Sequence, residues 1–394
     1  MKQIHTNINI IGGGLIGVAT AYALSKLGFK ITILEKNPIY DFKKNSLDLR
    51  TIAISEGTKK FFEDIGIWYK IIPYAEKIKR IKVIDRKLKN QLEFDNNRRK
   101  SNLGYIIKNS VLRDILYKKI KEQKNIKLLN KIKITNFQYT PENIITNTNY
   151  SKIISDLNIA ADGKNSFVKK VLKTPFYYKD YKKKALVIVF NHSKDHFGTA
   201  FEFFYNNGPL AILPMQKQGG SHMSSIVWTN EGDYLENLMN MDTEKFKILL
   251  FNETQGSVGD IKSIISKQLF PLSAHINTKF FEKRTIYIGD AAHSFHPIAG
   301  QGWNLGMNDV ENLFKLVNKY SNLGIDLGDS FFCKEYNKDN FYNAYRLYQI
   351  TDKLDNIFSI QNSMFSFSRA LGVNAIQKNT NIKNIISDFA MGIN

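Results

Sequence analysis

A strand followed by closely spaced glycines and then an acid gives the N-terminus the chemistry of a dinucleotide site. Gly12, Gly14 and Gly17 follow the apolar segment Ile8–Ile11. The first glycine permits a tight turn, the second lets a pyrophosphate approach the backbone, and the third lets the following helix pack on the strand. Glu35 comes about 20 residues later, where an acid binds ribose hydroxyls. The pattern predicts dinucleotide binding.

A second segment, near residue 300, has the composition of a cofactor cradle. An apolar strand at 286–288 is followed by Asp290, whose carboxylate suits a sugar hydroxyl. Gly300 and Gly302 let the backbone come close to a ligand, and a helix from Asn304 would direct its free N–H groups at that ligand. A flat, electron-accepting ring would fit there.

Periodicity predicts the elements that position these residues. We expect a helix at Val18–Leu27 ended by Gly28, and a strand at Lys30–Leu34. The helix after the second segment should bury one face, made of Val310, Leu313, Leu316, Val317 and Tyr320.

The middle and the end of the chain have other patterns. Short apolar strands from Ala185 to Thr229, with turns at Asn206-Asn207-Gly208 and Gly219-Gly220, predict an antiparallel sheet. After Asp326 the pattern is helical again. An apolar stripe there is interpreted as core, with a membrane-facing or partner-facing surface as the alternative; it consists of Leu354, Ile357, Phe358 and Phe365.

Length and composition limit the class of protein. The 394 residues suggest about two connected domains, and no apolar run is long enough for a transmembrane helix. The first strand begins so near Met1 that no secretory signal is expected, and the single Cys333 allows no intrachain disulfide. We therefore expect a cytoplasmic protein whose redox chemistry comes from a cofactor.

The formal net charge of +20 raises the question of anionic partners. The densest basic run is Tyr177–Lys184, YYKDYKKK, but no nucleic-acid module accompanies it, so a solvated loop or strand edge is favoured. Attraction to an anionic bilayer stays open. A metal site at His293, His296 and Asp290 is disfavoured, because Pro297 follows directly and no helix aligns the two imidazoles.

Three ordered motifs resemble those of the single-component FAD aromatic hydroxylases, which share the fold of p-hydroxybenzoate hydroxylase. They are GGGLIG at 12–17, IAADGKNSFVKK at 159–170, and GDAAHSFHPIAGQGWNLGMND at 289–309. A closer resemblance is to the ubiquinone-biosynthesis hydroxylases and covers nearly the whole chain. It rests on DLRTIAIS (48–55), IGIW (65–68), FEFFYNNGPLAILPM (201–215), YRLYQITDKLDNIFS (345–359) and the final Ala390-Met391-Gly392.

The resemblance implies an α/β fold in which a Rossmann-like FAD-binding domain is interleaved with a mainly antiparallel substrate domain. The FAD-binding parts would be 1–75, 106–175 and 281–325. The substrate domain would comprise 76–105 and 176–280, and a C-terminal helical segment would follow at 326–394.

The resemblance also implies roles for individual residues. The ADP half of FAD would be held by Gly12, Gly14, Gly17, Glu35 and Lys36. Arg50 and Arg113 match arginines near the flavin and its diphosphate, although each could instead form a structural ion pair, and Asp48 could simply brace the loop of Arg50.

The remaining implied contacts follow the other two motifs. Asp162 would contact FAD and the nicotinamide cofactor, and Asp290 the ribitol chain. The loop against the isoalloxazine ring would contain Gly300 and the residues assigned to catalysis, namely Pro297, Gly302 and Asn304. Lys169 stands where many relatives have arginine and loses bidentate geometry, so a phosphate contact there is in doubt.

The activity implied is hydroxylation of a polyprenylated phenol in ubiquinone biosynthesis, through a C4a-hydroperoxyflavin formed with O2. NAD(P)H or another electron donor would be the transient reductant. The resemblance leaves room for peripheral contact with the cytoplasmic membrane face and for association with other ubiquinone-biosynthesis proteins. Phe201–Tyr205 and Leu210–Pro214 are candidates for the substrate wall, while the group that assists phenol ionisation is not identified.

Three alternatives remain. A hydroxylase of a small soluble aromatic acid would need a carboxylate-binding set in the second sheet, and arginine is absent from Phe201–Thr229. A flavin-dependent prenyl reductase would consume no oxygen. An organising subunit with vestigial flavin binding would not need the intact GQGWN loop at 300–304.

Overall fold

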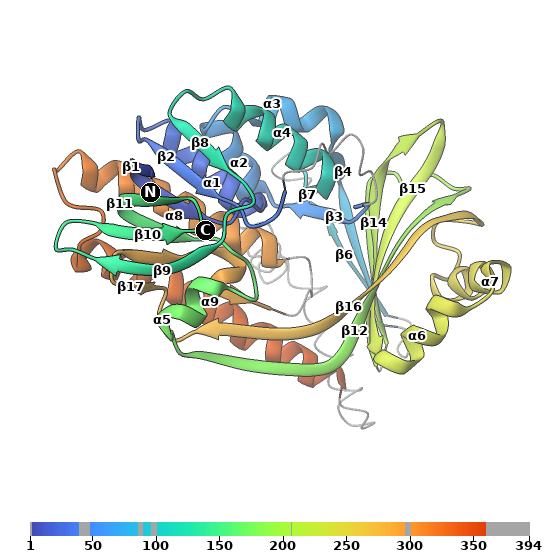
Figure 1. The fold of residues 1–394 in the computed structure, drawn as a ribbon. Helices are drawn as coiled ribbons and strands as arrows, with labels where there is room; N and C mark the ends of the chain where they lie inside the picture. Colours follow the sequence, from blue (N-terminus) through green and yellow to red (C-terminus); the bar gives the residue numbers. More distant parts are fainter. Residues whose placement is uncertain are drawn as a thin grey trace.

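Two sheets, connected by two long strands, organise the chain (Figure 1). The computed structural model describes residues 2–38, 48–85, 90–95, 101–205, 207–295 and 301–359. Helices pack around one sheet. The other sheet lies beside it and has two helices of its own on the face turned away from the first sheet (Figure 1). The predicted α/β class with an antiparallel second sheet is confirmed, while the domain boundaries stay predictions.

The first sheet is parallel at its centre. Its order is β17-β18-β11-β1-β2-β8, with β9 and β10 branching from β11 as an antiparallel extension. The strands are β1 (Lys2–Ile11), β2 (Ile31–Leu34), β8 (Ile126–Leu129), β9 (Ile134–Tyr139), β10 (Ile144–Thr148), β11 (Ser151–Ala160), β17 (Phe281–Glu282) and β18 (Thr285–Tyr287).

Burial on both faces explains the apolar runs of the central strands. Ile8, Ile10 and Ile11 of β1 are all buried between β2 and β11. Strands occur where they were predicted. β2 and β18 match the predicted 30–34 and 286–288 to within one residue at each end, and β1 ends at the predicted Ile11 but begins earlier, at Lys2. Helix α1 (Leu15–Ser25) begins three residues before the predicted Val18, directly after the glycine turn.

The second sheet is mainly antiparallel. Its order is β19-β16-β12-β15-β14-β13-β5-β6, and β13 and β5 are parallel. The strands are β5 (Arg80–Asp85), β6 (Asn90–Asp95), β12 (Phe176–His192), β13 (Thr199–Tyr205), β14 (Gly208–Gln218), β15 (Ser221–Glu231), β16 (Ile261–Asn277) and β19 (His293–Ser294). The predicted turn at Gly219-Gly220 connects β14 to β15, and β14 begins at Gly208 of the other predicted turn, whose Asn206 lies outside the described residues.

We call the first sheet with its helices the first body, and the second sheet with α6 and α7 the second body. β12 and β16 pair along almost their whole length and run from the first body into the second (Figure 1). The basic run Tyr177–Lys184 belongs to β12, so it is a paired strand rather than a loop, although Tyr177 and Tyr178 are exposed. Helices α6 (Gly232–Asn240) and α7 (Thr243–Glu253) cover the outer face of the sheet. That face carries a compact apolar cluster with Phe203 and Phe246 at its centre.

A small sheet lies between the two bodies. It has the order β3-β7-β4, from β3 (Thr51–Ile54), β7 (Gly104–Lys108) and β4 (Glu76–Ile78). Ile78 and Ile106 of this sheet pack with Met215 and Val189 of the second sheet. The adjoining helices are α2 (Glu56–Asp64), α3 (Trp68–Ile71), the 3-10 turn η1 (Ile72–Tyr74) and α4 (Asn109–Lys121).

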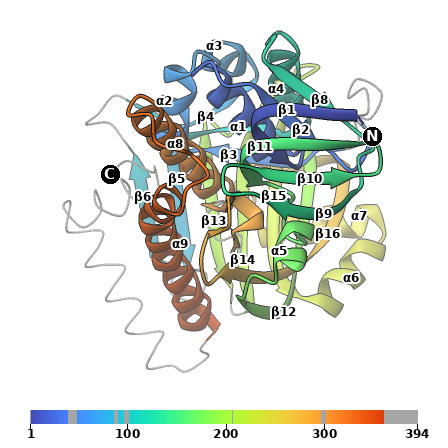
Figure 2. The ribbon, with the colours of Figure 1, turned by 60° about the vertical axis from the view of Figure 1, so that its left-hand side comes forward.

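The remaining helices complete the first body. They are α5 (Phe167–Leu172), the 3-10 turn η2 (Gly289–Ala291), α8 (Gln301–Ser321) and α9 (Ser330–Ser359). On α8, Val310, Leu313, Val317 and Tyr320 are buried as predicted and Leu316 is partly buried. α9 packs on α8 and extends toward β14 and β16 (Figure 2).

The predicted apolar stripe near the C-terminus falls largely outside the described part of the chain. The backbone of Leu354, Ile357 and Phe358 belongs to α9, but their side chains are not described, and Phe365 lies outside the described residues. Over the residues that are described, no helix combines the length and apolar character needed to cross a membrane.

We expect Gly17→Ala to lower the free energy of unfolding by about 1–3 kcal/mol, because the new methyl group would overpack the α1–β1 junction. A Cβ at Gly17 would lie 2.0 Å from the carbonyl oxygen of Gly12. Urea unfolding measures the difference. Gly14→Ala is the matched control, since a Cβ there meets nothing within 4 Å. Equal stability of the two variants would contradict the packing argument.

Candidate cofactor and substrate site

The glycine turn after β1 is packed directly against the end of β11. Gly12 has φ +112°, and a Cβ on it would lie 2.3 Å from the carbonyl oxygen of Ala161. A Cβ on Gly17 would lie 2.0 Å from the Gly12 carbonyl oxygen. Gly14, by contrast, borders open space, and no side chain caps the start of α1 there. The uncapped N–H groups and the helix dipole can therefore receive an anionic ligand.

Glu35 directly follows β2 and binds the backbone of this turn. Its Oε2 accepts a hydrogen bond from the Gly13 N–H at 2.7 Å, and its Oε1 accepts one from the Asn37 N–H at 2.8 Å. The Tyr117 hydroxyl donates to the Gly13 carbonyl at 2.5 Å. Lys36 is exposed. The carboxylate keeps unused acceptor positions that sugar hydroxyls could take.

A buried carboxylate fixes the turn that presents Asp290. Asp309 Oδ2, on α8, accepts hydrogen bonds from the Gly289 N–H at 2.9 Å and from His293 Nε2 at 2.7 Å. The side chains of Asp309 and His293 are each 1% exposed. His293 is thus committed to a protein partner, and its suggested metal partner His296 lies outside the described residues. Among the described residues no group of metal-ligating side chains occurs.

Helix α8 packs near its start against both the glycine turn after β1 and the Gly289 turn after β18. A Cβ on Gly306 would lie 2.9 Å from the Ile16 side chain and 3.3 Å from Gly289 Cα, so only glycine permits this approach. Gly302 borders open space. Trp303 Nε1 is buried without a hydrogen-bond partner among the described residues. Open space at Gly302 and a buried donor beside it together suit a bound ligand.

Two predicted residues of this loop, Pro297 and Gly300, lie outside the described residues. Asn304 is 8% exposed and is bound to protein. Its Oδ1 accepts from the Ser55 N–H at 2.9 Å and the Thr58 hydroxyl at 3.0 Å, and its Nδ2 donates to the Ala53 carbonyl at 2.9 Å. These contacts make Asn304 a positioning residue that ties α8 to β3, whereas its predicted catalytic role stays a prediction.

Arg50 and Arg113 share one carboxylate. Arg50 forms two hydrogen bonds with Asp48, at 2.7 and 2.8 Å, and Arg113 Nη2 lies 3.3 Å from the same residue. Burial alone would raise the pKa of Asp48, but the two arginines outweigh it and lower that pKa. Asp48 braces the Arg50 loop as predicted. The Arg50 guanidinium also lies 5.5 Å from the ring centre of Phe270 on the second sheet.

Asp162 caps α5. Its Oδ2 accepts from the Phe167 and Val168 N–H groups at 2.7 and 3.1 Å, and burial raises its pKa despite these bonds. Lys169 is 5% exposed and lies 4.5 Å from the ring centre of Phe176. Burial lowers the pKa of Lys169 to about 8, so this lysine keeps the charge that a phosphate contact needs only below about that pH.

Asp290 lies on the turn that follows β18. Its side chain is reached by solvent, yet surrounding protein raises its pKa even though His293 and Lys164 oppose the rise. The neighbouring His275 is 2% exposed, and burial, with the charge of Lys169 next in importance, lowers its pKa to about 3. A neutral imidazole therefore lies beneath the turn that carries Asp290.

Strand alternation divides the predicted substrate wall between two faces. Phe201, Phe203 and Leu210 pack toward α6 and α7, away from the cofactor turns. The prediction is therefore wrong for these residues, because their register puts them on the outer face. The inner face carries the alternate positions, including Ala200 and Leu213, which pack with the small sheet.

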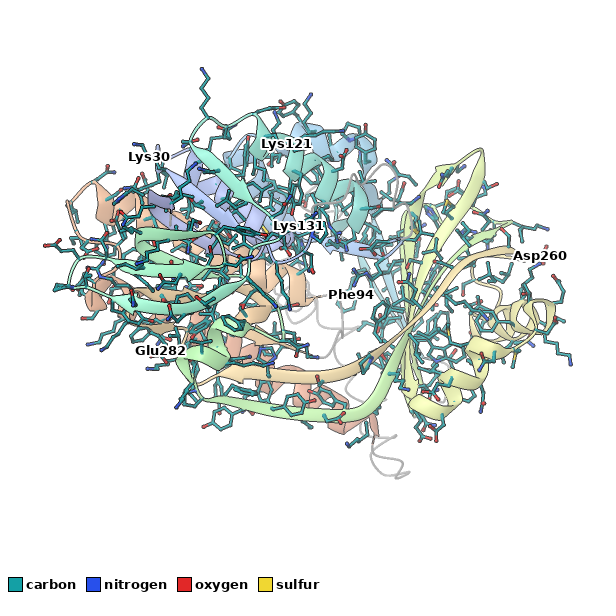
Figure 3. All side chains as sticks on the ribbon, viewed as in Figure 1. Lys30, Phe94, Lys121, Lys131, Asp260 and Glu282 are labelled. Atoms are coloured by element: carbon teal, nitrogen blue, oxygen red, sulfur yellow. The ribbon has the colours of Figure 1, made fainter. Side chains whose placement is uncertain are left out.

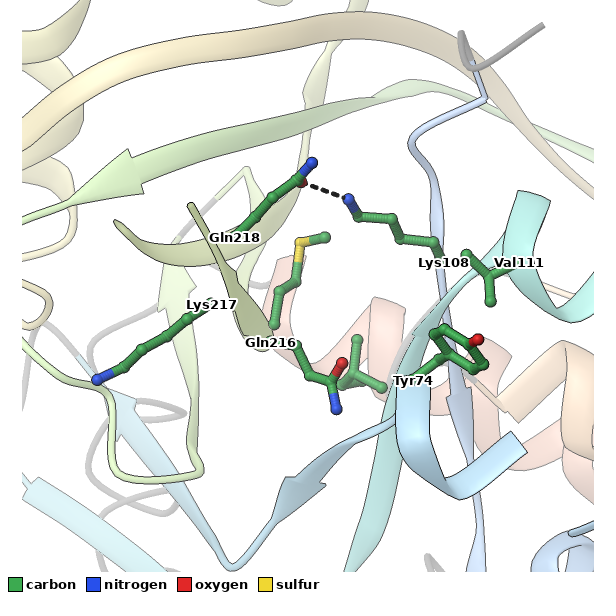
Figure 4. A pocket seen from close by; sticks show the side chains of 8 residues that line it. Tyr74, Lys108, Val111, Gln216, Lys217 and Gln218 are labelled. Carbon is green, nitrogen blue, oxygen red and sulfur yellow. Dashed lines mark hydrogen bonds between the residues drawn. The ribbon is translucent and has the colours of Figure 1, made fainter. Parts of the chain in front are cut away.

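A cavity of about 190 Å³ lies beside this inner face, between β14 and β7 (Figure 4). Lys108 Nζ donates to Gln218 Oε1 across it at 2.9 Å, and burial lowers the pKa of Lys108. The lining residues are Tyr74, Ile106, Lys108, Val111, Met215, Gln216, Lys217 and Gln218. None of them was a predicted site residue.

Sequence reasoning assigned no role to Asp309 or Tyr117. Asp309 is the last residue of the third quoted motif, so its position was visible but its partners were not. Tyr117 follows Arg113 by four residues on α4, and this spacing puts both on one helix face toward the cofactor turns. This spacing could have indicated from the sequence that Tyr117 lies beside Arg113 near the cofactor turns.

Comparisons with known proteins agree with this arrangement. The profile of a family described as "FAD binding domain" matches residues 5–322. Ubiquinone hydroxylase UbiL of Rhodospirillum rubrum is 26% identical over 98% of this chain and 89% of its own length. Ubiquinone hydroxylase UbiM of Neisseria meningitidis is 26% identical over 98% of this chain and 84% of its own.

A human relative and a solved structure extend the comparison. Human ubiquinone biosynthesis monooxygenase COQ6, mitochondrial, is 26% identical over 98% of this chain and 92% of its own length. The crystal structure of p-nitrophenol 4-monooxygenase PnpA from Pseudomonas putida superposes with a TM-score of 0.81 at 15% identity, covering 100% of this chain and 99% of that one. This likeness shows the fold.

Removing the buried acceptor should be costly. Asp309→Leu leaves the Gly289 N–H and His293 Nε2 without their partner, so we expect the free energy of unfolding to fall by about 3–5 kcal/mol. Asp309→Asn keeps one acceptor oxygen of the same size and should cost less. Urea unfolding compares the two. An equally small loss in both variants would show that the pair is not structurally important.

His275 should make the fold sensitive to acid. Its folded pKa of about 3 lies below the ordinary value of about 6.5, so only the unfolded chain binds this proton at intermediate pH. The free energy of unfolding should fall as the pH drops through this window, by about 2 kcal/mol between pH 7 and 5. His275→Gln should lose that part of the decrease, whereas the exposed His5→Gln should not. Thermal unfolding at both pH values tests this, and identical pH responses of all three proteins would contradict it.

Proposed function

Because the chain belongs to the FAD binding domain family, we propose that it is an FAD-dependent monooxygenase that hydroxylates the aromatic ring of a polyprenylated phenol in ubiquinone biosynthesis. The observation that carries the proposal is the match of 98% of the chain to proteins named ubiquinone hydroxylases. The apolar inner face of the second sheet supports it, because a polyprenyl tail needs such a surface.

Bound FAD would supply the redox chemistry, since it takes electrons from a reductant and activates dioxygen for transfer of one oxygen atom to the ring. The start of α1 at Gly14 would receive the diphosphate through its uncapped N–H groups. Glu35, already holding the Gly13 N–H, would accept from the adenosine ribose, with Lys36 beside it. Gly12 and Gly17 permit the close packing of this turn.

The flavin half would be held by the other turns. Asp290 would bind the ribitol chain, and Gly300, Gly302 and Pro297 would lie against the ring system. The dipole at the start of α8 would stabilise negative charge on the flavin. Asn304 would act indirectly, because its amide fixes α8 against β3.

The charged residues around these turns would complete the cofactor site. Arg50 and Arg113, braced by Asp48, would lie near the flavin and its diphosphate, and Asp162 would orient the start of α5 toward the cofactors. We propose NAD(P)H or another electron donor as the transient reductant.

We further propose that the enzyme works at the cytoplasmic face of a membrane and associates with other ubiquinone-biosynthesis proteins. The polyprenyl tail of the proposed substrate resides in bilayers, and the net charge of +20 would favour anionic headgroups. No nucleic-acid partner is proposed.

The direct test supplies purified, FAD-loaded protein with a polyprenylated phenol, NAD(P)H and isotopically labelled dioxygen. We expect a product heavier by one labelled oxygen atom, measured by mass spectrometry. Gly302→Leu should lose copurifying FAD and activity, because its side chain would enter open space reserved for the ligand. Lys315→Leu, on an exposed face of the same helix, is the control and should retain both.

The rival activities give different results in this assay. A hydroxylase of small soluble aromatics would label a short phenol but not the prenylated one. A prenyl reductase would oxidise the reductant without incorporating labelled oxygen. Bound, reducible FAD with no labelled product from the prenylated phenol would overturn the proposed function.

A further inference from the structure

Glu202 is an acid on a face of the second sheet where its neighbours are apolar. It lies on β13 between Phe201 and Phe203, which pack toward α6 and α7. Because successive side chains of a strand alternate, Glu202 shares the opposite, inner face with Ala200. Phe94, on the same inner face, lies on the side of the sheet toward the first body (Figure 3). Glu202 therefore points toward the body that carries the cofactor turns.

The register gives Glu202 two apolar lateral neighbours. It is paired with Ala211 on β14 and with Val83 on β5, and the same row continues to Leu92 and Val227. A charged carboxylate in such a row lowers the stability of the fold unless it is protonated or paired. Among the described residues no hydrogen-bond or ion-pair partner of Glu202 is found.

Glu202 is partly accessible, yet protein surrounds it on all sides. Burial raises its pKa to about 7, and no charged group is among the causes. The titratable side chains on elements packed against or next to this face are Asp48, Arg50, Glu76, Lys77, Tyr105, Lys108 and Tyr348. None of them shifts the Glu202 pKa. Glu202 is therefore a partly accessible acid whose surroundings disfavour its charged form.

Described elements of the first body lie opposite the inner face. Arg50 contacts Phe270 on the second sheet, and Asn304 joins β3 to the start of α8. Tyr348 of α9 packs near Val227 on the inner face, and its ring lies 5.9 Å from that of Phe295, which precedes the loop. The elements around the inner face are thus β3 with Arg50, and α9.

We propose that Glu202 is the catalytic base that ionises the phenol of the substrate. This inference rests on the proposed function and supplies the proton acceptor that hydroxylation of a phenol requires. A base must be near its substrate and must titrate near the working pH. Among the residues that the structure describes, Glu202 is an unpaired acid on the sheet face toward the body that carries the cofactor turns, and its raised pKa suits the second condition.

The proton transfer is balanced within the substrate and Glu202. The phenol O–H bond breaks, its electron pair stays on the phenolate oxygen, and the proton forms an O–H bond on the Glu202 carboxylate. The phenolate is more electron-rich and so more easily attacks an electrophilic oxygen. Glu202 can return the proton to the hydroxylated product, so no additional acid or oxidant is required.

The test compares wild type with Glu202→Gln in hydroxylation of a polyprenylated phenol over a range of pH. In wild type, kcat/KM should rise with pH through about 7, because the base must be deprotonated. Glu202→Gln should lower kcat/KM at neutral pH by about 10²–10⁴-fold and lose this titration. A ring-fluorinated form of the same phenol, which ionises at lower pH, should restore much of the rate in the variant.

Glu93→Gln is the matched control. Glu93 lies on β6 next to Leu92, so alternation puts it on the outer face, where it pairs with Lys82. It should retain wild-type kcat/KM and pH dependence. If Glu202→Gln also retains them while wild type makes the labelled product, the role of Glu202 is overturned and the proposed function stands. If wild type makes no product from either phenol, the proposed function itself fails.

A readout without turnover separates a base from a structural acid. The infrared difference spectrum of wild type minus Glu202→Gln, recorded across pH, should contain a protonated carboxyl band that disappears with a midpoint near 7. Copurifying FAD and the urea midpoint should be unchanged in the variant. A band that has already disappeared at the ordinary glutamate pKa of about 4.3 would contradict the inference.

Discussion

The site depends first on one buried carboxylate. Asp309 joins helix α8 to the Gly289 backbone and to His293, and His293 begins β19, which pairs with β16 of the second sheet. A single acceptor thus connects the helix that would support the flavin, the turn that presents Asp290, and the sheet that would cover the substrate. Burying a charge is unfavourable unless donors surround it, so the arrangement of all three elements is fixed together rather than one by one.

A second constraint is that the two bodies share their strands. β12 and β16 extend from the first body into the second sheet. Arg50 against the Phe270 ring, and Tyr348 in the same apolar cluster as Val227, add contacts between the two. The proposed reaction chamber is consequently formed where the bodies meet, with apolar rows on one side and hydrogen-bonded turns on the other. Such a division suits a substrate with an apolar tail and a polar ring.

Local patterns predicted the parts of the site that depend on short segments. A strand followed by Gly12, Gly14 and Gly17 predicts its own turn, and the apolar face of α8 follows from helical spacing. Contacts between distant segments were out of reach. Nothing near Asp309 in the chain indicates its bond to Gly289, and the wall prediction at Phe201 and Phe203 could not tell the inner face from the outer one. Glu202 looked like an ordinary polar position of a half-buried strand until its register with Ala211 and Val83 was known.

The parallel sheet also determines when the chain can fold. β1 lies between β2 and β11, and β11 in turn needs β18, so strands from residues 2–11, 151–160 and 285–287 must assemble side by side. During synthesis β1 can pair with β2 early, but its other neighbour, β11, emerges much later, and an exposed strand edge in the interval favours aggregation. A chain interrupted before residue 285 would lack the neighbour of β11 and also β19, the edge strand beside β16. The N-terminal half of the chain is consequently the part whose strand edges stay exposed longest during synthesis.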